Sequence, residues 1–302
     1  MCNISEKSSP SETRLARTSP AIIINTLSIA LLFLTSFSVS LSHAQCNLTL
    51  GYRTEDKPPY MAGTNQQTKA ENSGIYQELY SKASNRVKCT LRIVRKPKKR
   101  ILMELKSGSV DIYPAFNFTK LRAKDFYFID SGLSKQNVGI SRYDLEEITN
   151  LEQLRGKTAM LAFGSLNRYQ SIQGVDIYEI PNLTIAQVIR GLKLKRADFY
   201  FSNYSEFLYY QQNNYPLTGG YKIHHHCCGS PKVVYMAFSK KSPYYQEKVN
   251  PNFNSNQAIS PLNQPTEPLK TSIAYKLFLS LQQMKNEGIS KKIHNQYFNA
   301  LK

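Results

Sequence analysis

Two short segments of the chain end in polar side chains whose types suit the binding of a small molecule. LKSGSVDIYPAF is followed by Asn117, Thr119 and Arg122, and the related LKLKRADFYF is followed by Ser202 and Asn203. Ligands of open α/β sheets bind outside the carboxyl ends of the strands. We therefore expect these two groups of side chains to lie on opposite rims of one cleft.

The elements that must position these side chains form a repeated unit. In residues 105–113 and again in 192–200, an amphipathic helix end passes through a small or basic turn into an alternating strand. Asp111 and Asp198 occupy the same place in the two copies. The sequence therefore predicts an α/β fold of two Rossmann-like lobes that face one ligand cleft.

Helices and strands alternate through both halves of the chain. Residues 243–268 are rich in Pro, Asn, Gln and Ser without a periodic apolar face, so we expect an extended connector there. The predicted organisation is an export signal over 1–44, a first lobe over 45–137 and 238–302, and a second lobe over 138–237, with hinge strands near 138–141 and 233–239.

The first 44 residues have the pattern of a signal peptide. A basic-leaning start precedes the apolar run AIIINTLSIALLFLTSFSVS and the small-x-small sequence Ser42-His43-Ala44. We predict export with cleavage after Ala44. Because about 20 apolar residues can span a bilayer, an uncleaved membrane anchor is the alternative. A lipoprotein anchored at Cys46 is not favoured, since the residues before it lack the expected pattern.

The chain is strongly basic, with 39 Lys and Arg against 21 Asp and Glu and a formal charge of +18. Such a charge could serve nucleic acid, an anionic envelope surface or negatively charged ligands. Its densest cluster, residues 95–100, lies where a strand ends and a helix begins, and no recognisable nucleic-acid module accompanies it. We interpret it as a solvated helix start and exclude nucleic acid as a partner.

Four cysteines remain after the predicted cleavage, which suggests disulfides in an oxidising compartment. Cys46 and Cys89 open the first and second strands at equivalent positions. In neighbouring parallel strands their α-carbons would lie about 5 Å apart, within disulfide range. We predict a Cys46–Cys89 bond.

The segment from His224 to Cys228, HHHCC, permits several interpretations. Imidazole and thiolate suit zinc or copper. However, alternate side chains of an extended segment point in opposite directions, so five consecutive ligands cannot all reach one ion. A strained Cys227–Cys228 disulfide, an intermolecular disulfide, a metal site and a plain polar connector all stay open.

Gly164 and Ser165 end a predicted strand and open a predicted helix over 166–173. Unpaired N–H groups and the helix dipole at such a point attract a carboxylate or phosphate. The signal is weak by itself.

Taken in order, the segments resemble bacterial extracytoplasmic solute-binding proteins of family 3, which have the type 2 periplasmic-binding fold and serve amino-acid uptake. The resemblance covers essentially all of 46–302. It rests on a first strand followed by PPY, LKSGSVD, the Thr119 and Arg122 pair, LRGKTAMLAFGS, KRADFYFSN, AFSKKSP and MKNEG. It implies a monomeric periplasmic protein that captures an amino acid or related small carboxylate for an inner-membrane ABC transporter permease, without catalysis or cofactor.

The resemblance also implies ligand contacts. Arg122 would pair with a carboxylate, because a planar guanidinium offers two parallel charge-assisted bonds that strengthen when the lobes close. An ordinary ion pair with Asp125 is the alternative. The other expected contacts are Asn117, Thr119, Gly164, Ser165, Asn203, and Tyr60 as an aromatic wall with Tyr52 behind it.

Position 203 departs from the family pattern. Members that bind amino acids usually have an acidic residue five positions after the second-lobe aspartate, where it receives the ligand's ammonium, and here that residue is Asn203. The stretch between Asp111 and Arg122 is also one residue shorter than in the best-known members. A modified amino acid, a peptide fragment and a carboxylate without an amine are all open as ligands.

Two other functions compete with binding for transport. Some relatives with this fold are lyases on small cyclic carboxylates, which need an acid or base in the cleft. The candidates are Glu55, Glu206 and a histidine of 224–226, and none is paired with a second catalytic group. A metal-binding or sensory module would instead use His224 to Cys228.

Overall fold

The structure is a computed structural model that describes residues 46–54, 56–63, 72–162, 169–170, 172–181, 183–213 and 220–299. The predicted signal, Glu55, Gly164 and Ser165 lie outside these ranges. The chain divides into two units, 1–44 and 45–302, and everything described belongs to the second. None of the helices in the described ranges combines the length and hydropathy that crossing a membrane requires.

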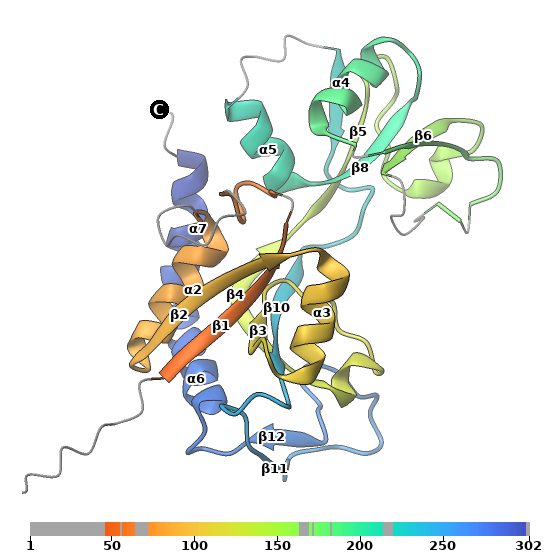
Figure 1. The fold of residues 1–302 in the computed structure, drawn as a ribbon. Coiled ribbons are helices and arrows are strands. Elements are labelled where there is room, and N and C mark those ends of the chain that lie inside the picture. The colour runs from red at the N-terminus through yellow and green to blue at the C-terminus, as the bar shows by residue number, and fades with distance from the viewer. Residues whose placement is uncertain are drawn as a thin grey trace, which may run out of the picture. The chain divides into compact units, whose positions relative to one another are not determined.

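The first sheet has five strands in the order β2-β1-β3-β10-β4 (Figure 1). Strand β1 runs parallel to β2 and β3, whereas β10 runs antiparallel to β3 and β4. Most of β1 is buried, as expected for a parallel strand covered on both faces. The bounds are β1 (Cys46–Arg53), β2 (Cys89–Lys96), β3 (Ile112–Tyr113), β4 (Phe126–Lys135) and β10 (Lys232–Ser239).

The second sheet also has five strands, in the order β7-β6-β8-β5-β9. Its strands β7, β6 and β8 are parallel, and β5 runs antiparallel to β8 and β9. Each sheet therefore places three parallel strands beside an antiparallel one, which confirms the predicted two-lobed α/β class. The bounds are β5 (Asn137–Arg142), β6 (Thr158–Ala162), β7 (Asp176–Ile180), β8 (Phe199–Asn203) and β9 (Tyr221–His224).

Apolar helix faces cover both sheets. The core of the first sheet is built from Leu48 and Leu50 against Leu79 of α2 and Leu277 of α6. In the second sheet, Val188 of α4 packs in the core with strand residues. The helices are α2 (Ile75–Arg86), α3 (Lys98–Ser107), α4 (Ile185–Lys193), α5 (Tyr204–Asn213), α6 (Ile273–Asn286) and α7 (Ile289–Asn299), with 3-10 turns η1 (Arg122–Lys124) and η2 (Leu151–Leu154).

The predicted connector over 243–268 contains a small ladder that the sequence reasoning missed. Strands β11 (Glu247–Val249) and β12 (Thr266–Pro268) pair antiparallel. Three residues are too few to show an alternating pattern. The pairing is therefore invisible until the chain is folded.

The repeated aspartates have the same structural role in the two sheets. Asp111 accepts the N–H of Thr49 through Oδ2 at 2.7 Å and donates its own N–H to the Thr49 carbonyl at 3.0 Å. Asp198 makes the same two contacts with Thr158, at 2.8 Å and 2.7 Å. Each aspartate thus joins the start of one parallel strand to its neighbour, which explains why the residue recurs.

The turn before each aspartate supports a prediction. Gly108 and Lys195 occupy equivalent positions, and both have positive φ, 87° and 57°. A left-handed conformation costs a non-glycine residue roughly 1–2 kcal/mol. Glycine avoids this cost, but it loses more conformational entropy on folding, which offsets part of the gain. We expect Lys195→Gly to raise the free energy of unfolding by about 0.5–1 kcal/mol, measured by urea denaturation.

Gly108→Ala is the matched substitution with the opposite expected sign. A Cβ at position 108 would lie 2.3 Å from the carbonyl oxygen of Lys241. We expect a loss of at least about 2 kcal/mol in the same assay. If both substitutions changed the free energy of unfolding in the same direction, the left-handed conformation would not be equally strained for non-glycine residues in the two turns.

The predicted disulfide is present. Cys46 and Cys89 are directly opposite in the parallel ladder of β1 and β2, and their sulfur atoms are bonded with a Cα–Cα separation of 4.5 Å. The bond closes the β1-α2-β2 unit at its amino-terminal edge.

Candidate functional site

Arg122 lies at the start of η1 and is held by its own segment. Its Nη1 donates to the Asn117 carbonyl at 2.8 Å, its guanidinium carbon lies 4.1 Å from the centre of the Phe116 ring, and its backbone N–H donates to Thr119 Oγ1 at 3.2 Å. The side chain is partly exposed, less buried than the sequence interpretation implied. The contacts with Asn117 and Phe116 nevertheless hold the guanidinium in place, and the contact with Thr119 holds the backbone of residue 122.

The alternative ion pair between Arg122 and Asp125 does not form. Asp125 pairs instead with Lys106 at 3.0 Å. Among the described residues, no carboxylate forms an ion pair with Arg122. The guanidinium therefore contacts an aromatic ring and a carbonyl oxygen. No carboxylate of the described residues neutralises the positive charge of Arg122, so this charge can attract the carboxylate of a ligand.

A second cation lies beside this group. Lys135, the last residue of β4, donates from Nζ to Asn117 Oδ1 at 3.1 Å. Asn117 thus connects two positive side chains, through its carbonyl to Arg122 and through its side-chain oxygen to Lys135. The local charge favours an anion. Asn117 and Thr119 are both exposed, and both lie with Arg122 as predicted.

A row of buried aromatic rings begins at Phe116, under the guanidinium. Successive ring centres are separated by 5.4 Å from Phe116 to Tyr113, 6.2 Å to Tyr52, 6.0 Å to Tyr76 and 5.1 Å to Tyr60. All five side chains are at most 5% exposed. Tyr52 and Tyr60, expected to form an aromatic wall, are core residues in this structure, because both rings pack against Tyr76 of α2.

The far end of the row meets the second sheet. Burial raises the pKa of Tyr60 to about 12, so its hydroxyl stays protonated at neutral pH. The Tyr60 hydroxyl donates to Asn203 Oδ1 at 3.3 Å, and the same oxygen accepts the backbone N–H of Glu206 at 3.2 Å. The structure therefore brings Tyr60 and Asn203, both of them predicted ligand contacts, into direct contact with each other. Ser202, also expected on this rim, is buried and donates from Oγ to the Asn203 carbonyl.

An ion pair missed by the sequence analysis lies beside Asn203. Lys57 Nζ is 2.7 Å from Glu206 Oε1, and the two side chains are 41% and 22% exposed. From the sequence, Glu206 is a candidate only for the acid or base of a lyase. The signal that could have found it is its place one helical turn after Asn203, at the start of α5.

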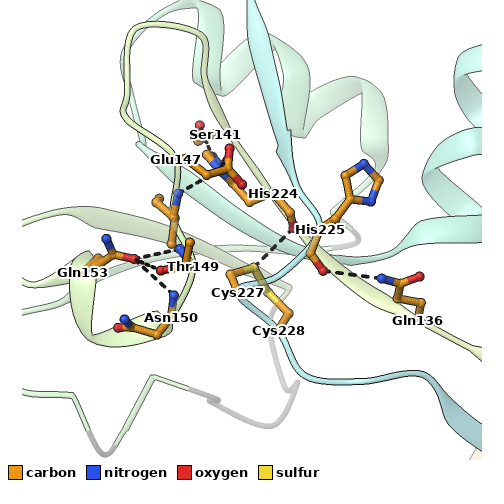
Figure 2. Close-up of a disulfide and its surroundings, with 11 residues drawn as sticks. Gln136, Ser141, Glu147, Thr149, Asn150, Gln153, His224, His225, Cys227 and Cys228 are labelled. Carbon is orange, nitrogen blue, oxygen red and sulfur yellow. Dashed lines mark hydrogen bonds and ion pairs between the residues drawn. A yellow bond between two sulfur atoms is a disulfide. The ribbon is translucent and has the colours of Figure 1, made fainter.

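His224 and the adjacent disulfide lie close together at the end of β9 (Figure 2). Ser141 Oγ donates to the Arg142 carbonyl, so it accepts from Nε2–H of His224 at 2.7 Å. Nδ1 of His224 then accepts the N–H of Ile148 at 3.0 Å. This pattern requires the neutral ring with its proton on Nε2, although Glu147 Oε2 lies 3.2 Å from Nδ1. His224 is a structural residue at the end of β9.

The adjacent cysteines are bonded to each other. Cys227 and Cys228 form a disulfide, and Cys227 is buried with Phe199 in the core of the second sheet. Gln136 Nε2 donates to the His225 carbonyl nearby. Across the described residues, no group of three or more His, Cys, Asp or Glu side chains is placed to hold a metal ion. Of the interpretations left open for HHHCC, the structure has the intramolecular disulfide.

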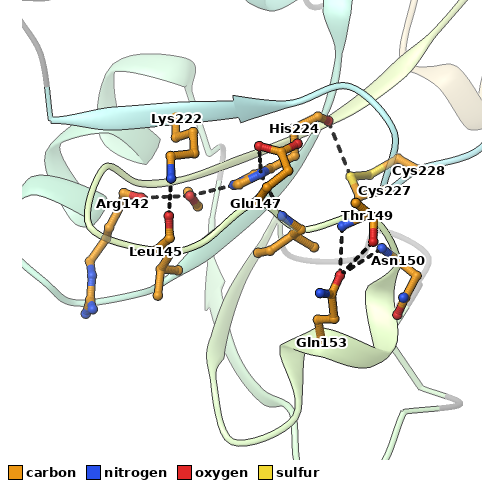
Figure 3. Close-up of polar contacts among 12 residues, drawn as sticks. Arg142, Leu145, Glu147, Thr149, Asn150, Gln153, Lys222, His224, Cys227 and Cys228 are labelled. Atoms are coloured by element: carbon orange, nitrogen blue, oxygen red, sulfur yellow. Dashed lines mark hydrogen bonds and ion pairs between the residues drawn. A yellow bond between two sulfur atoms is a disulfide. The ribbon is translucent and has the colours of Figure 1, made fainter.

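The loop beneath this disulfide is closed by side-chain contacts (Figure 3). Gln153 Oε1 accepts the N–H groups of Thr149 at 2.7 Å and Asn150 at 3.1 Å, and Lys222 Nζ donates to the Leu145 carbonyl. These bonds fix residues 145–153 over His224. They stabilise the fold and offer no reacting group.

Acidification should destabilise the protein through His224. Burial lowers the pKa of His224 because it disfavours the charged ring, and the nearby Glu147 carboxylate opposes this effect. The unfolded chain takes up a proton near the ordinary histidine pKa of about 6.5, at a higher pH than the folded protein does. This contribution to stability is complete above that pH and is lost as the pH falls below it. The urea midpoint should therefore decrease from pH 7.5 to 5.

His224→Gln provides the comparison for this prediction. Burial also lowers the pKa of His294, so that residue acts in the same direction in both proteins. The decrease in midpoint should be smaller in His224→Gln than in the parent. Identical decreases would assign the pH dependence to other groups.

The two five-stranded sheets and their shared strand topology define a two-lobed α/β fold. The sequence matches the bacterial extracellular solute-binding proteins, family 3, over residues 48–300. The chain belongs to this family, as its motifs indicated. None of the curated proteins matches the sequence.

Solved structures show the same type 2 periplasmic-binding fold. The YckB protein of Bacillus subtilis is 17% identical, with 84% of this chain and 90% of that chain covered and a TM-score of 0.61. The amino-acid ABC transporter substrate-binding protein AbpA from Streptococcus pneumoniae, bound to L-arginine, is 16% identical, with 85% and 96% covered and a TM-score of 0.55. The ancestral amino-acid-binding protein AncCDT-1, a precursor of cyclohexadienyl dehydratase, is 16% identical, with 84% and 95% covered and a TM-score of 0.56.

Proposed function

We propose that this protein captures an amino acid or a related small carboxylate outside the cytoplasm and delivers it to an ABC-type uptake transporter. The observation that carries the proposal is the state of Arg122. Its guanidinium is fixed by Asn117 and Phe116 and forms no ion pair with a carboxylate of the described chain. A fixed, planar cation of this kind suits bidentate binding of a carboxylate.

Membership of the solute-binding family supports the same function. The S. pneumoniae relative is an ABC transporter protein bound to L-arginine, so the fold accommodates a ligand with a carboxylate. For this chain we propose Arg122, Asn117 and Thr119 on the first rim and Asn203 on the second. Gly164 and Ser165 remain proposed contributors to the anion site.

The proposed mechanism is closure of two lobes on the ligand. We propose lobe boundaries at 45–137 with 238–302, and at 138–237, and an exported monomer that meets a membrane permease when closed. Ligand that binds the closed state shifts the population toward it. Because the ligand binds only folded protein, the melting temperature should rise with its concentration.

A ligand screen on the exported protein tests the proposal. Native mass spectrometry of protein purified under mild conditions would detect a retained small molecule. Thermal shift assays would compare the twenty L-amino acids with matched carboxylates that lack the amine and with matched amines that lack the carboxylate. We expect stabilisation by carboxylates only. Stabilisation by the amines alone, or by none of the compounds, would count against the proposal.

A further inference from the structure

We infer that the disulfide between Cys227 and Cys228 is a redox-sensitive hinge element, and that its reduction loosens the chain crossings between the two sheets. The inference goes beyond the proposed function, since it concerns what controls the movement of the lobes and not what they bind. It follows from the place of this bond in the chain, at the point where the second sheet is connected back to the first.

The described chain passes between the two sheets at two points. It leaves the first sheet at the end of β4, passes through Gln136 and enters the second sheet at β5. It returns over residues 225–231, between β9 and β10, and the disulfide lies within this return crossing. Both crossings adjoin the predicted hinge strands, near 138–141 and 233–239. A movement of one lobe against the other must be absorbed by backbone angles at such connections.

Contacts hold the two crossings against each other. Gln136 Nε2 donates to the His225 carbonyl at 3.4 Å (Figure 2). The Gln136 carbonyl accepts the N–H of Tyr204 at 2.9 Å, and the Tyr204 ring packs edge to face on the His225 ring with 5.1 Å between the centres. These three residues therefore form a closed set of contacts that connects the outgoing crossing, the return crossing and the start of α5.

The disulfide also packs against the strand that begins at the outgoing crossing. Sγ of Cys227 lies next to Gly139 of β5, so close that a Cβ at position 139 would be 2.9 Å from this sulfur. The Cys227 side chain is 7% exposed and packs in the core with Phe199. A change in the conformation of residues 227–228 would therefore displace atoms that contact β5.

A bond between adjacent cysteines restricts the backbone directly. It closes a small ring that contains the peptide bond between the two residues, so it limits their backbone angles in the folded protein. Reduction opens this ring, and the freed residues gain conformational entropy. Because the ring lies in one of the two crossings, we expect the reduced protein to populate a wider range of lobe arrangements.

The exposure of the two sulfur atoms determines how the bond would be reduced. Cys228 is partly exposed, whereas Cys227 is buried. A thiolate of a dithiol reductant would attack Sγ of Cys228, and Cys227 would leave as a thiolate that takes up a proton. The second thiol would then attack the mixed disulfide, which releases the Cys228 thiol and leaves the reductant as a disulfide. Two electrons and two protons thus pass from a dithiol, such as that of a dithiol oxidoreductase, to the protein.

The bond between Cys46 and Cys89 should resist the same reductant. A disulfide that stabilises the folded protein is harder to reduce by the same free energy, and this one joins residues 43 positions apart. The bond between adjacent residues closes no long loop. We therefore expect selective reduction at 227 and 228 under conditions in which the protein stays folded.

Graded reduction of the exported protein with dithiothreitol tests the inference without any ligand. Alkylation followed by peptide mass mapping would report which cysteines are reduced, and Cys227 and Cys228 should be reduced first. Amide hydrogen exchange should then rise by at least about threefold over 225–231 and also over 135–139. The radius of gyration, measured by X-ray scattering, should increase.

The double variant Cys227→Ala/Cys228→Ala is the matched form that lacks the bond permanently. Without reductant it should show the exchange and the radius of gyration of the reduced parent, and selective reduction should not change it further. The reduced parent carries the test if this variant folds poorly. Exchange over β1 and β2 is the internal control, because these strands hold the remaining disulfide, and it should stay unchanged in every sample.

Three results would overturn the inference. An increase in exchange confined to 225–231 would make the disulfide a structural bond of one loop. An unchanged radius of gyration would show that loosened crossings do not move the lobes. A bond at 227 and 228 that is reduced only when the protein unfolds would exclude the redox role. None of these results bears on ligand capture, which the ligand screen decides separately.

Discussion

Replacing Cys46 and Cys89 together by alanine should lower the free energy of unfolding by about 4 kcal/mol. The two residues are 43 positions apart, and the bond between them limits the conformations of the unfolded chain. The entropy of closing a loop of this length accounts for the expected value. Alanine is preferred to serine because Cys89 is buried and a hydroxyl there would need a partner. The measurement is the denaturant midpoint with its slope.

The second disulfide provides the matched control for this prediction. Cys227 and Cys228 are adjacent, so their bond closes no long loop in the unfolded chain. The double alanine variant at 227 and 228 should lose much less stability than the variant at 46 and 89. A larger loss at 227 and 228 would mean that local conformation, rather than loop closure, dominates the effect of these bonds.

Arg122→Met should weaken binding of the ligand found in the screen by on the order of 100-fold or more. The substitution removes two charge-assisted hydrogen bonds and leaves the ligand's carboxylate unpaired in a closed cleft, a change that costs about 2–5 kcal/mol or more. Methionine retains an unbranched apolar chain that can still cover Phe116. Stability should fall by only about 1 kcal/mol, because the substitution removes one hydrogen bond to the exposed Asn117 and the contact of the cation with Phe116 but no ion pair with the described residues.

Arg122→Lys and Arg155→Met complete this experiment. Lysine keeps the charge but not the planar fork, so its affinity should fall between those of the parent and Arg122→Met. Arg155 is 66% exposed and paired with Glu152, so its replacement should leave affinity unchanged. An unaltered dissociation constant in Arg122→Met would remove Arg122 as the anchor and, with it, the main support for the proposed function.

Several features could be predicted from the sequence because they depend on short-range patterns. The copies around Asp111 and Asp198 predicted two α/β lobes, and the structure shows the reason in the matching contacts to Thr49 and Thr158. The place of Cys46 and Cys89 at the start of two strands predicted their bond. The Thr119 and Arg122 spacing brought these residues into contact within one turn. Such features need no knowledge of distant parts of the chain.

Other features depend on segments that meet only in the folded molecule. The Lys57–Glu206 pair joins residues from two segments that lie about half the chain apart, and no local pattern indicates that they pair. The aromatic row contains tyrosines from different elements, whose sequence pattern is that of ordinary core residues. The sequence by itself determined the α/β class and the family, since helix and strand periodicity and short motifs are local, and it predicted Arg122 as the anion anchor. The tertiary structure alone decided which charges and rings share a site, because long-range side-chain contacts follow from packing.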